Sequence, residues 1–146
     1  MTKYQNSILI NRPLAEVFAL LSNAENESKW KSGDVEITKT SPGPIGIDST
    51  WCSVAHILGE RIENQMGYTE YEQNWKYTVK SQSGPYPYES QVTFERVAGF
   101  TQVSMRAKAE AGGFFKMAET LLTSIVKRQA QDDLANLKDM LEAQTV

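Results

Sequence analysis

The C-terminal part of the chain carries the pattern that most restricts the fold. Residues 114–142 contain no glycine or proline and are rich in good helix formers. They predict one helix of roughly 29 residues, about 43 Å long. Its apolar residues recur at helical period and form one stripe. They are Phe114, Ala118, Leu121, Leu122, Ile125, Val126, Ala130, Leu134, Leu137 and Leu141. A helix of this kind requires an equally long apolar partner surface.

The preceding residues predict that partner, an antiparallel sheet. Between residues 34 and 109, short segments alternate apolar and polar side chains, and turns rich in Gly and Pro separate them. We expect a first strand over residues 2–10. Further strands are expected near residues 35–38, 49–58, 61–71, 75–79, 86–94 and 103–107. Gly67 marks a candidate β-bulge within one of them.

Two short helices are expected directly after the first strand. Pro13 suits the first turn of a helix, where its missing N–H costs nothing, and the apolar positions of residues 14–21 form one stripe. A second short helix is expected to end near Trp30. The predicted fold is therefore α+β. A curved antiparallel sheet of six to seven strands wraps around the long C-terminal helix, and the two short helices close one end.

Composition narrows the classes of function. With 146 residues and 40% hydrophobic residues, one domain over residues 1–146 is expected. A net charge of −3 argues against nucleic acid as a partner. The single cysteine, Cys52, excludes an intrachain disulfide and fits a cytoplasmic location. The apolar run over residues 8–10 is too short for a signal-peptide core or a membrane span, so we expect no integral membrane association.

The sequence also excludes several kinds of catalytic site. One His and one Cys are too few for a zinc site built from these ligands. Phosphate-loop, dinucleotide-binding and serine-elbow motifs are absent, so we expect neither a metal nor a tightly bound redox cofactor. His56 is the candidate acid–base residue, since its pKa lies near neutrality. Strand alternation places it with Val54 on a face that we expect to point into a cavity. A hydrogen-bonded histidine on the sheet surface is the alternative.

Motifs along the whole chain resemble those of a known family. They are Ile8-x-Ile10-x-Arg12-Pro13, Asn23-Ala24-Glu25-Asn26 leading to Lys29-Trp30, Gly43-Pro44-Ile45-Gly46, Thr69-Glu70-Tyr71-Glu72, and residues 133–142. In order and spacing they are similar to the polyketide cyclase/dehydrase and lipid-transport branch of the START-like (SRPBCC) superfamily. The resemblance implies a helix-grip fold with a cavity for a small apolar ligand between sheet and helix. Gln73-Asn74 departs from the Pro-Pro pair that relatives often carry there.

Three functions follow from the resemblance and stay open at this point. The first is binding or transport of a small hydrophobic molecule, such as a lipid, a polyketide or an aromatic compound. The second is a cyclase- or dehydratase-type enzyme that uses His56 with a tyrosine or Glu70 as a proton shuttle. The third is a co-chaperone-like module that binds another protein. A monomer and a homodimer are both compatible with the sequence.

The expected cavity lining combines inward-pointing strand positions with the start of the long helix. Tyrosine hydroxyls there would orient a ligand, with plain core packing as the alternative. By strand parity Glu70 shares the face of Met66 and Tyr68, unless a bulge at Gly67 reverses it. Burial on that face would raise the pKa of Glu70, and a solvated glutamate on the strand is the alternative. The predicted set is Val54, His56, Met66, Tyr68, Glu70, Trp75, Tyr77, Tyr86, Tyr88, Met105, Phe114, Ala118, Leu121 and Ile125.

Overall fold

The computed structural model describes residues 2–31, 35–57, 59–83, 87–109 and 119–143. Within them the chain forms seven strands, three α-helices and one 3₁₀ helix. In chain order these are β1 (Thr2–Ile10), α1 (Leu14–Ser22), η1 (Ala24–Asn26), α2 (Glu27–Trp30), β2 (Val35–Lys39), β3 (Thr50–Ile57), β4 (Glu60–Glu72), β5 (Lys76–Ser83), β6 (Tyr88–Val97), β7 (Phe100–Ala109) and α3 (Glu119–Glu142).

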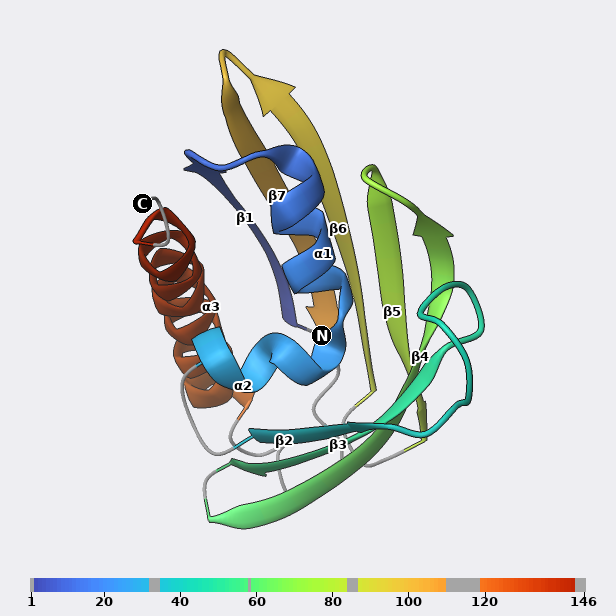
Figure 1. Ribbon diagram of the computed structural model, residues 1–146. Helices are drawn as coiled ribbons and strands as arrows, with labels where there is room; N and C mark the ends of the chain where they lie inside the picture. The colour runs from blue at the N-terminus through green and yellow to red at the C-terminus, as the bar shows by residue number, and fades with distance from the viewer. Residues whose placement is uncertain (1, 32–34, 58, 84–86, 110–118, 144–146) are drawn as a thin grey trace.

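The strands form one antiparallel sheet in the order β1-β7-β6-β5-β4-β3-β2. The sheet is strongly bent, so that β2 and β3 cross below the helices while β1, β7 and β6 stand behind them (Figure 1). α1 lies over β6 and β7, and α3 runs beside β1. This arrangement confirms the predicted α+β fold with a curved sheet around a long helix.

α1 begins and packs as its sequence predicts. Pro13 stands at the N-cap position, and Glu16 places a negative charge in the first turn, near the positive end of the helix dipole. Val17, Phe18 and Leu21 are buried against the sheet. Burial of this stripe holds the helix in place, because an isolated nine-residue helix is marginal in water.

α3 confirms the predicted amphipathic pattern where its side chains are described. Leu134, Leu137 and Leu141 are buried, at 0 to 3% exposure. Near its C-terminal end, Lys138 Nζ donates to the Leu9 carbonyl at 2.8 Å, which ties the helix to β1. Residues 114–118, the predicted first part of this helix, lie outside the described residues. No helix in the described part of the chain combines the length and apolar character that a membrane span requires.

Candidate ligand pocket

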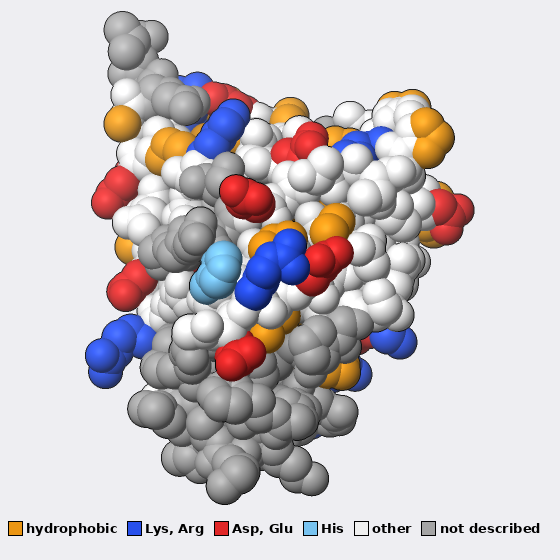
Figure 2. Space-filling view, turned by 90° about the horizontal axis from the view of Figure 1, so that it is seen from below, with side chains coloured by type: hydrophobic (Ala, Val, Ile, Leu, Met, Phe, Trp, Pro, Cys, Tyr) orange, Lys and Arg blue, Asp and Glu red, His pale blue; other side chains and the backbone are white. Residues whose placement is uncertain are grey.

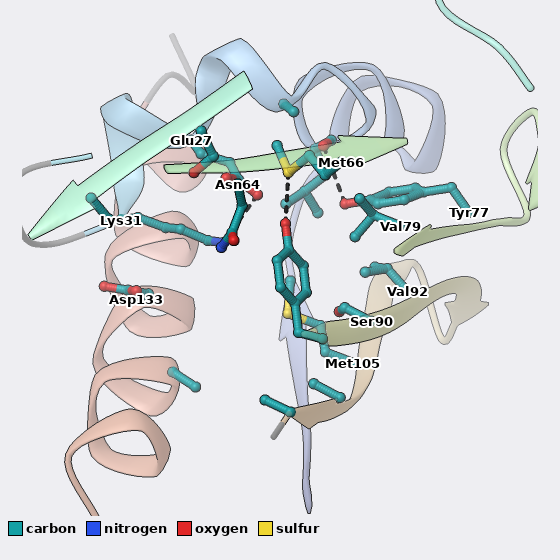
Figure 3. Close-up of a pocket in the computed structure, with 18 of the residues that line it drawn as sticks. Glu27, Lys31, Asn64, Met66, Tyr77, Val79, Ser90, Val92, Met105 and Asp133 are labelled. Atoms are coloured by element: carbon teal, nitrogen blue, oxygen red, sulfur yellow. Dashed lines mark hydrogen bonds and ion pairs between the residues drawn. The ribbon is translucent and has the colours of Figure 1, made fainter. Parts of the chain in front are cut away.

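A cavity of about 280 Å³ lies between the inner face of the sheet, α2 and α3 (Figure 3). The space exists because many inward-pointing positions carry small side chains, which leave the opposite walls apart. These small lining residues are Ala24, Ser53, Ala55, Ser90, Ala107, Ala109 and Ala130. They come from η1, β3, β6, β7 and α3, so no single segment builds the cavity.

Larger apolar and aromatic side chains form one wall of the cavity. Five of them are residues that the sequence predicted for the cavity lining: Met66, Tyr68, Tyr77, Tyr88 and Met105. Figure 3 shows Met66, Tyr77, Val79 and Val92 on this side. Their position in the lining agrees with the prediction, and their contact with a ligand stays a prediction.

The tyrosine hydroxyls mostly have partners within the protein. Tyr68 donates to the Ser22 carbonyl and Tyr77 to the Leu21 carbonyl at 3.1 Å, so both hold the last turn of α1 against the sheet. Burial raises the pKa of both hydroxyls far above the usual value, so they stay protonated donors. Tyr88 donates to the Met66 sulfur at 2.7 Å, and a thioether is a weak acceptor.

Polar side chains gather on the opposite side of the cavity, around α2. Lys31 Nζ and Glu27 Oε1 form an ion pair at 3.0 Å. Asn64 of β4 is buried beside them, and Asp133 of α3, also buried, faces the cavity from the other helix (Figure 3). The pocket therefore has an apolar wall and a polar wall.

The predicted orientation of Val54 and His56 is wrong. Trp51 is fully buried and packs on Tyr68, with ring centroids 4.5 Å apart. Strand alternation then points Ser53 and Ala55 into the cavity, so Val54 and His56 point to the other face of β3. His56 is exposed, and its imidazole lies on the outside of the molecule (Figure 2).

Glu70 also lies on the outer face, contrary to its predicted parity. The ladder between β4 and β5 shifts register between Tyr68 and Glu70, which adds Thr69 to β4 and reverses the alternation. A second shift between Gln65 and Met66 lies on the other side of Gly67. The hydrogen bond from Thr78, followed by the one from Lys76, lowers the pKa of the Glu70 carboxyl. Glu70 is thus an outer-face ion-pair partner.

Of the other predicted residues, only Trp75 is described with its side chain, and it lies away from the pocket. Trp75 belongs to the turn before β5 rather than to the strand and is 55% exposed. Tyr86, Phe114 and Ala118 are outside the described residues. Leu121 and Ile125 belong to α3, and their side chains are outside the described part as well. Among the described residues, no group of three or more His, Cys, Asp or Glu side chains is placed to hold a metal ion.

The sequence prediction missed the polar wall. The sequence does contain a signal for Asn64. This residue interrupts the alternating apolar series Ile62, Met66 and Tyr68 on the inward face of β4. A polar residue in an inward series is unusual enough to indicate a site. Glu27 and Lys31 carried no such signal, because charged residues on a short helix are ordinary surface features.

Comparison with known proteins identifies the same architecture over the whole chain. The family model described as polyketide cyclase/dehydrase and lipid transport matches residues 1–142. The structure of TTHA0849 from Thermus thermophilus is similar at a TM-score of 0.82 and 17% identity, over 99% of both chains. A comparison with curated proteins finds no match.

Two further structures have the same fold in other settings. The di-domain ARO/CYC StfQ from the steffimycin biosynthetic pathway gives a TM-score of 0.70 at 13% identity, over 95% of this chain and 44% of that one. Ara h 8.0201 gives 0.65 at 12% identity, over 97% and 98%. At these identities the likeness shows the fold alone, and it confirms the predicted helix-grip architecture.

Proposed function

This chain belongs to the polyketide cyclase/dehydrase and lipid-transport family, and from that premise we propose that it binds or carries a small, mainly apolar molecule. The site is the pocket between the sheet, α2 and α3. The observation that carries the proposal is a cavity of about 280 Å³ left open by small side chains in an otherwise closely packed interior. Protein interiors rarely leave space of this size unfilled without a use for it.

The composition of the apolar wall supports the same function. Met66, Tyr68, Tyr77 and Val92 are each at most 6% exposed, so the wall offers apolar surface to a ligand. The hydroxyls of Tyr68 and Tyr77 are engaged by α1 and do not add polarity to it. An apolar molecule that enters the pocket gains roughly 25 cal/mol for each Å² of apolar surface removed from water.

The cyclase- or dehydratase-type enzyme, which the sequence left open as an alternative, has less support. His56 and Glu70 both lie on the outer face, whereas the pocket opens on the inner face. The Tyr68 and Tyr77 hydroxyls stay protonated and are held by backbone carbonyls. A shuttle built from His56 with Glu70 or one of these tyrosines therefore has no common substrate atom within reach. A co-chaperone-like module that binds another protein does not require a cavity. That function therefore does not account for the cavity in the interior.

The test is to fill the pocket. In Ser90→Phe, a ring enters the cavity from β6, and we expect loss of binding of the uncharged fluorescent probe prodan with the thermal unfolding midpoint retained. Thr93→Phe is the matched control, because it places the same ring on the outer face of the same strand. Native mass spectrometry of the purified protein, followed by denaturing extraction, would identify a co-purifying molecule. Prodan binding that is absent in the unmodified protein, or unchanged in Ser90→Phe, would overturn the proposal.

A further inference from the structure

The outer face of the sheet carries a groove of about 630 Å³, which crosses the sheet from β1 to β4. Strand alternation directs its polar side chains away from the ligand pocket, because Tyr77, Val92 and Met105 of the same strands point into that pocket. The residues that line this outer groove are Lys3, Gln5, Thr69, Glu70, Thr78, Glu89, Gln91, Arg106, Ala107 and Lys108. The described lining is thus polar and contains no large apolar side chain.

Five of the lining residues form one row across neighbouring strands. In register order they are Gln5 of β1, Arg106 of β7, Gln91 of β6, Thr78 of β5 and Glu70 of β4. Neighbouring strands lie about 4.8 Å apart, so the row extends over about 19 Å. An extended peptide of about six residues covers the same length, since it rises about 3.3 Å per residue.

At the β4 end of the row, the acidic side chain is already engaged within the protein. Glu70 Oε1 accepts from Thr78 Oγ1 at 2.9 Å and from Gln91 Nε2 at 3.4 Å. Glu70 Oε2 lies 3.2 Å from Lys76 Nζ. The carboxylate of Glu70 is therefore balanced by a neighbouring cation.

At the β1 and β7 end, the groove is basic and its charge is not balanced. Lys3 and Arg106 are exposed, and neither has a hydrogen bond or ion pair with any residue of the described ranges. Lys108, the register partner of Lys3, pairs with Glu89 at 3.6 Å. Two uncompensated positive charges thus lie in one groove of a chain whose net charge is −3. An anionic partner is the electrostatic complement of this end.

The spacing of the two uncompensated cations fits one pattern of anions. Lys3 lies opposite Lys108, two residues from Arg106 on β7, so Lys3 and Arg106 are diagonal neighbours about 7–8 Å apart. In an extended chain, alternate side chains point to the same side and lie about 6.6 Å apart. Two carboxylates at alternate positions of an extended segment can therefore contact both cations at once.

We propose that the outer groove binds an extended acidic segment of a partner protein that carries carboxylates at alternate positions. One carboxylate contacts Arg106 and the other contacts Lys3, while the remainder of the segment follows the row toward Gln91. A hollowed polar surface accommodates a peptide chain better than the face of a membrane, which would need a flat or protruding contact with apolar side chains. This inference goes beyond the proposed function, since groove and ligand pocket lie on opposite faces of the sheet.

Three capped hexapeptides test the charge and its spacing. Gly-Asp-Ser-Asp-Ser-Gly has alternate carboxylates, Gly-Asp-Asp-Ser-Ser-Gly has the same composition with adjacent carboxylates, and Gly-Asn-Ser-Asn-Ser-Gly is uncharged. Each is titrated into isotope-labelled protein at low salt, and NMR shifts of the backbone amides report binding. The alternating peptide should bind about threefold more tightly than the adjacent one and about tenfold more tightly than the uncharged one, as one and two exposed ion pairs predict. High salt should remove both differences.

Substitution of Arg106 assigns the binding to this groove. Arg106→Gln removes the charge at an exposed position and should weaken the alternating peptide about threefold, with the uncharged peptide unaffected. Lys3→Gln should act in the same way. Arg96→Gln is the matched control, because Arg96 is an exposed arginine of β6 that is absent from the described lining of the groove. Prodan binding should be unchanged in all three variants, so this test is independent of the proposed function.

Several outcomes would overturn the proposal. Equal affinity for the alternating and adjacent peptides would contradict the spacing, and equal affinity for the charged and uncharged peptides would contradict the basic site. Binding to phosphatidylglycerol vesicles that is lost in Arg106→Gln, without peptide binding, would assign the surface to a membrane instead. A dimer in sedimentation that dissociates in Arg106→Gln would assign it to a second copy of this chain.

Discussion

Under α1, the inner face of the sheet carries rings in mutual contact, whereas beside α2 the same face carries small side chains and open space. Phe18 lies within 5.0 to 6.3 Å, centroid to centroid, of Tyr71, Tyr77 and Phe94. Elsewhere on the same sheet, Ala55 of β3, Ser90 of β6 and Ala107 of β7 border the cavity. One sheet thus carries a packed region and a hollow region, and the described side chains that line them differ in size.

The comparison teaches how such a protein remains stable with a cavity. Dispersion contacts and removal of apolar surface from water are concentrated under α1, where buried rings contact one another. Beside α2 the cavity lining makes fewer such contacts. The fold tolerates this because the packed region holds the sheet and helices together. Stability and ligand binding are therefore expected to respond to different substitutions.

The largest effect is expected from emptying the packed region. Phe18→Ala removes a ring with three aromatic neighbours and should lower the free energy of unfolding by about 3 to 5 kcal/mol, measured by urea denaturation. Phe100→Ala, at a position 37% exposed in the β6–β7 hairpin, is the control and should change it by less than about 1 kcal/mol. Similar losses at both sites would contradict the division into regions.

A smaller effect is expected at the boundary between the two regions. Tyr77→Phe leaves the Leu21 carbonyl without its buried donor and should lower the free energy of unfolding by about 1 to 3 kcal/mol. Tyr71→Phe is the matched control, since the described structure gives the Tyr71 hydroxyl no hydrogen bond. Chemical denaturation of both variants gives the comparison, and a neutral Tyr77→Phe would remove the anchoring role assigned to this hydroxyl.

The smallest effect is expected from enlarging a side chain, and its sign should differ between the regions. Ala55→Leu extends into the cavity and should raise the free energy of unfolding by about 0.5 to 2 kcal/mol, as cavity filling does. Val103→Leu adds one methylene to a fully buried position beside Phe94 and should lower it, because overpacking forces strain. Thermal and urea unfolding report both changes. A loss of stability in Ala55→Leu would argue that the cavity is already filled.

The order of elements and the two amphipathic helices were accessible from sequence because they depend on local patterns. Periodicity indicated the buried faces of α1 and α3, and Pro, Gly and alternation indicated most of the turns and strands. On β4 to β7 the inward-pointing residues could also be predicted. Met66, Tyr77, Tyr88 and Met105 alternate with polar residues and share their face with other apolar residues.

For β3, the sequence does not indicate in this way which residues point inward. Cys52, Val54 and His56 on one face are about as apolar as Ser53 and Ala55 on the other. Alternation therefore gives no preference, and Trp51, which packs on Tyr68 from a different strand, decides which face is inside. The irregularity at Thr69 had the same consequence for Glu70, because a register shift depends on the partner strand.

By itself the sequence determined that a long amphipathic helix lies against a curved antiparallel sheet, because burial of periodic apolar stripes is required wherever they occur. Only the tertiary structure decided that the tyrosine hydroxyls are used to hold α1, and that Trp30 and Asn64 come together in the lining of one cavity. Those contacts join residues tens of positions apart in the chain. Their hydrogen bonding depends on where the strands and helices finally pack, and no local pattern records it.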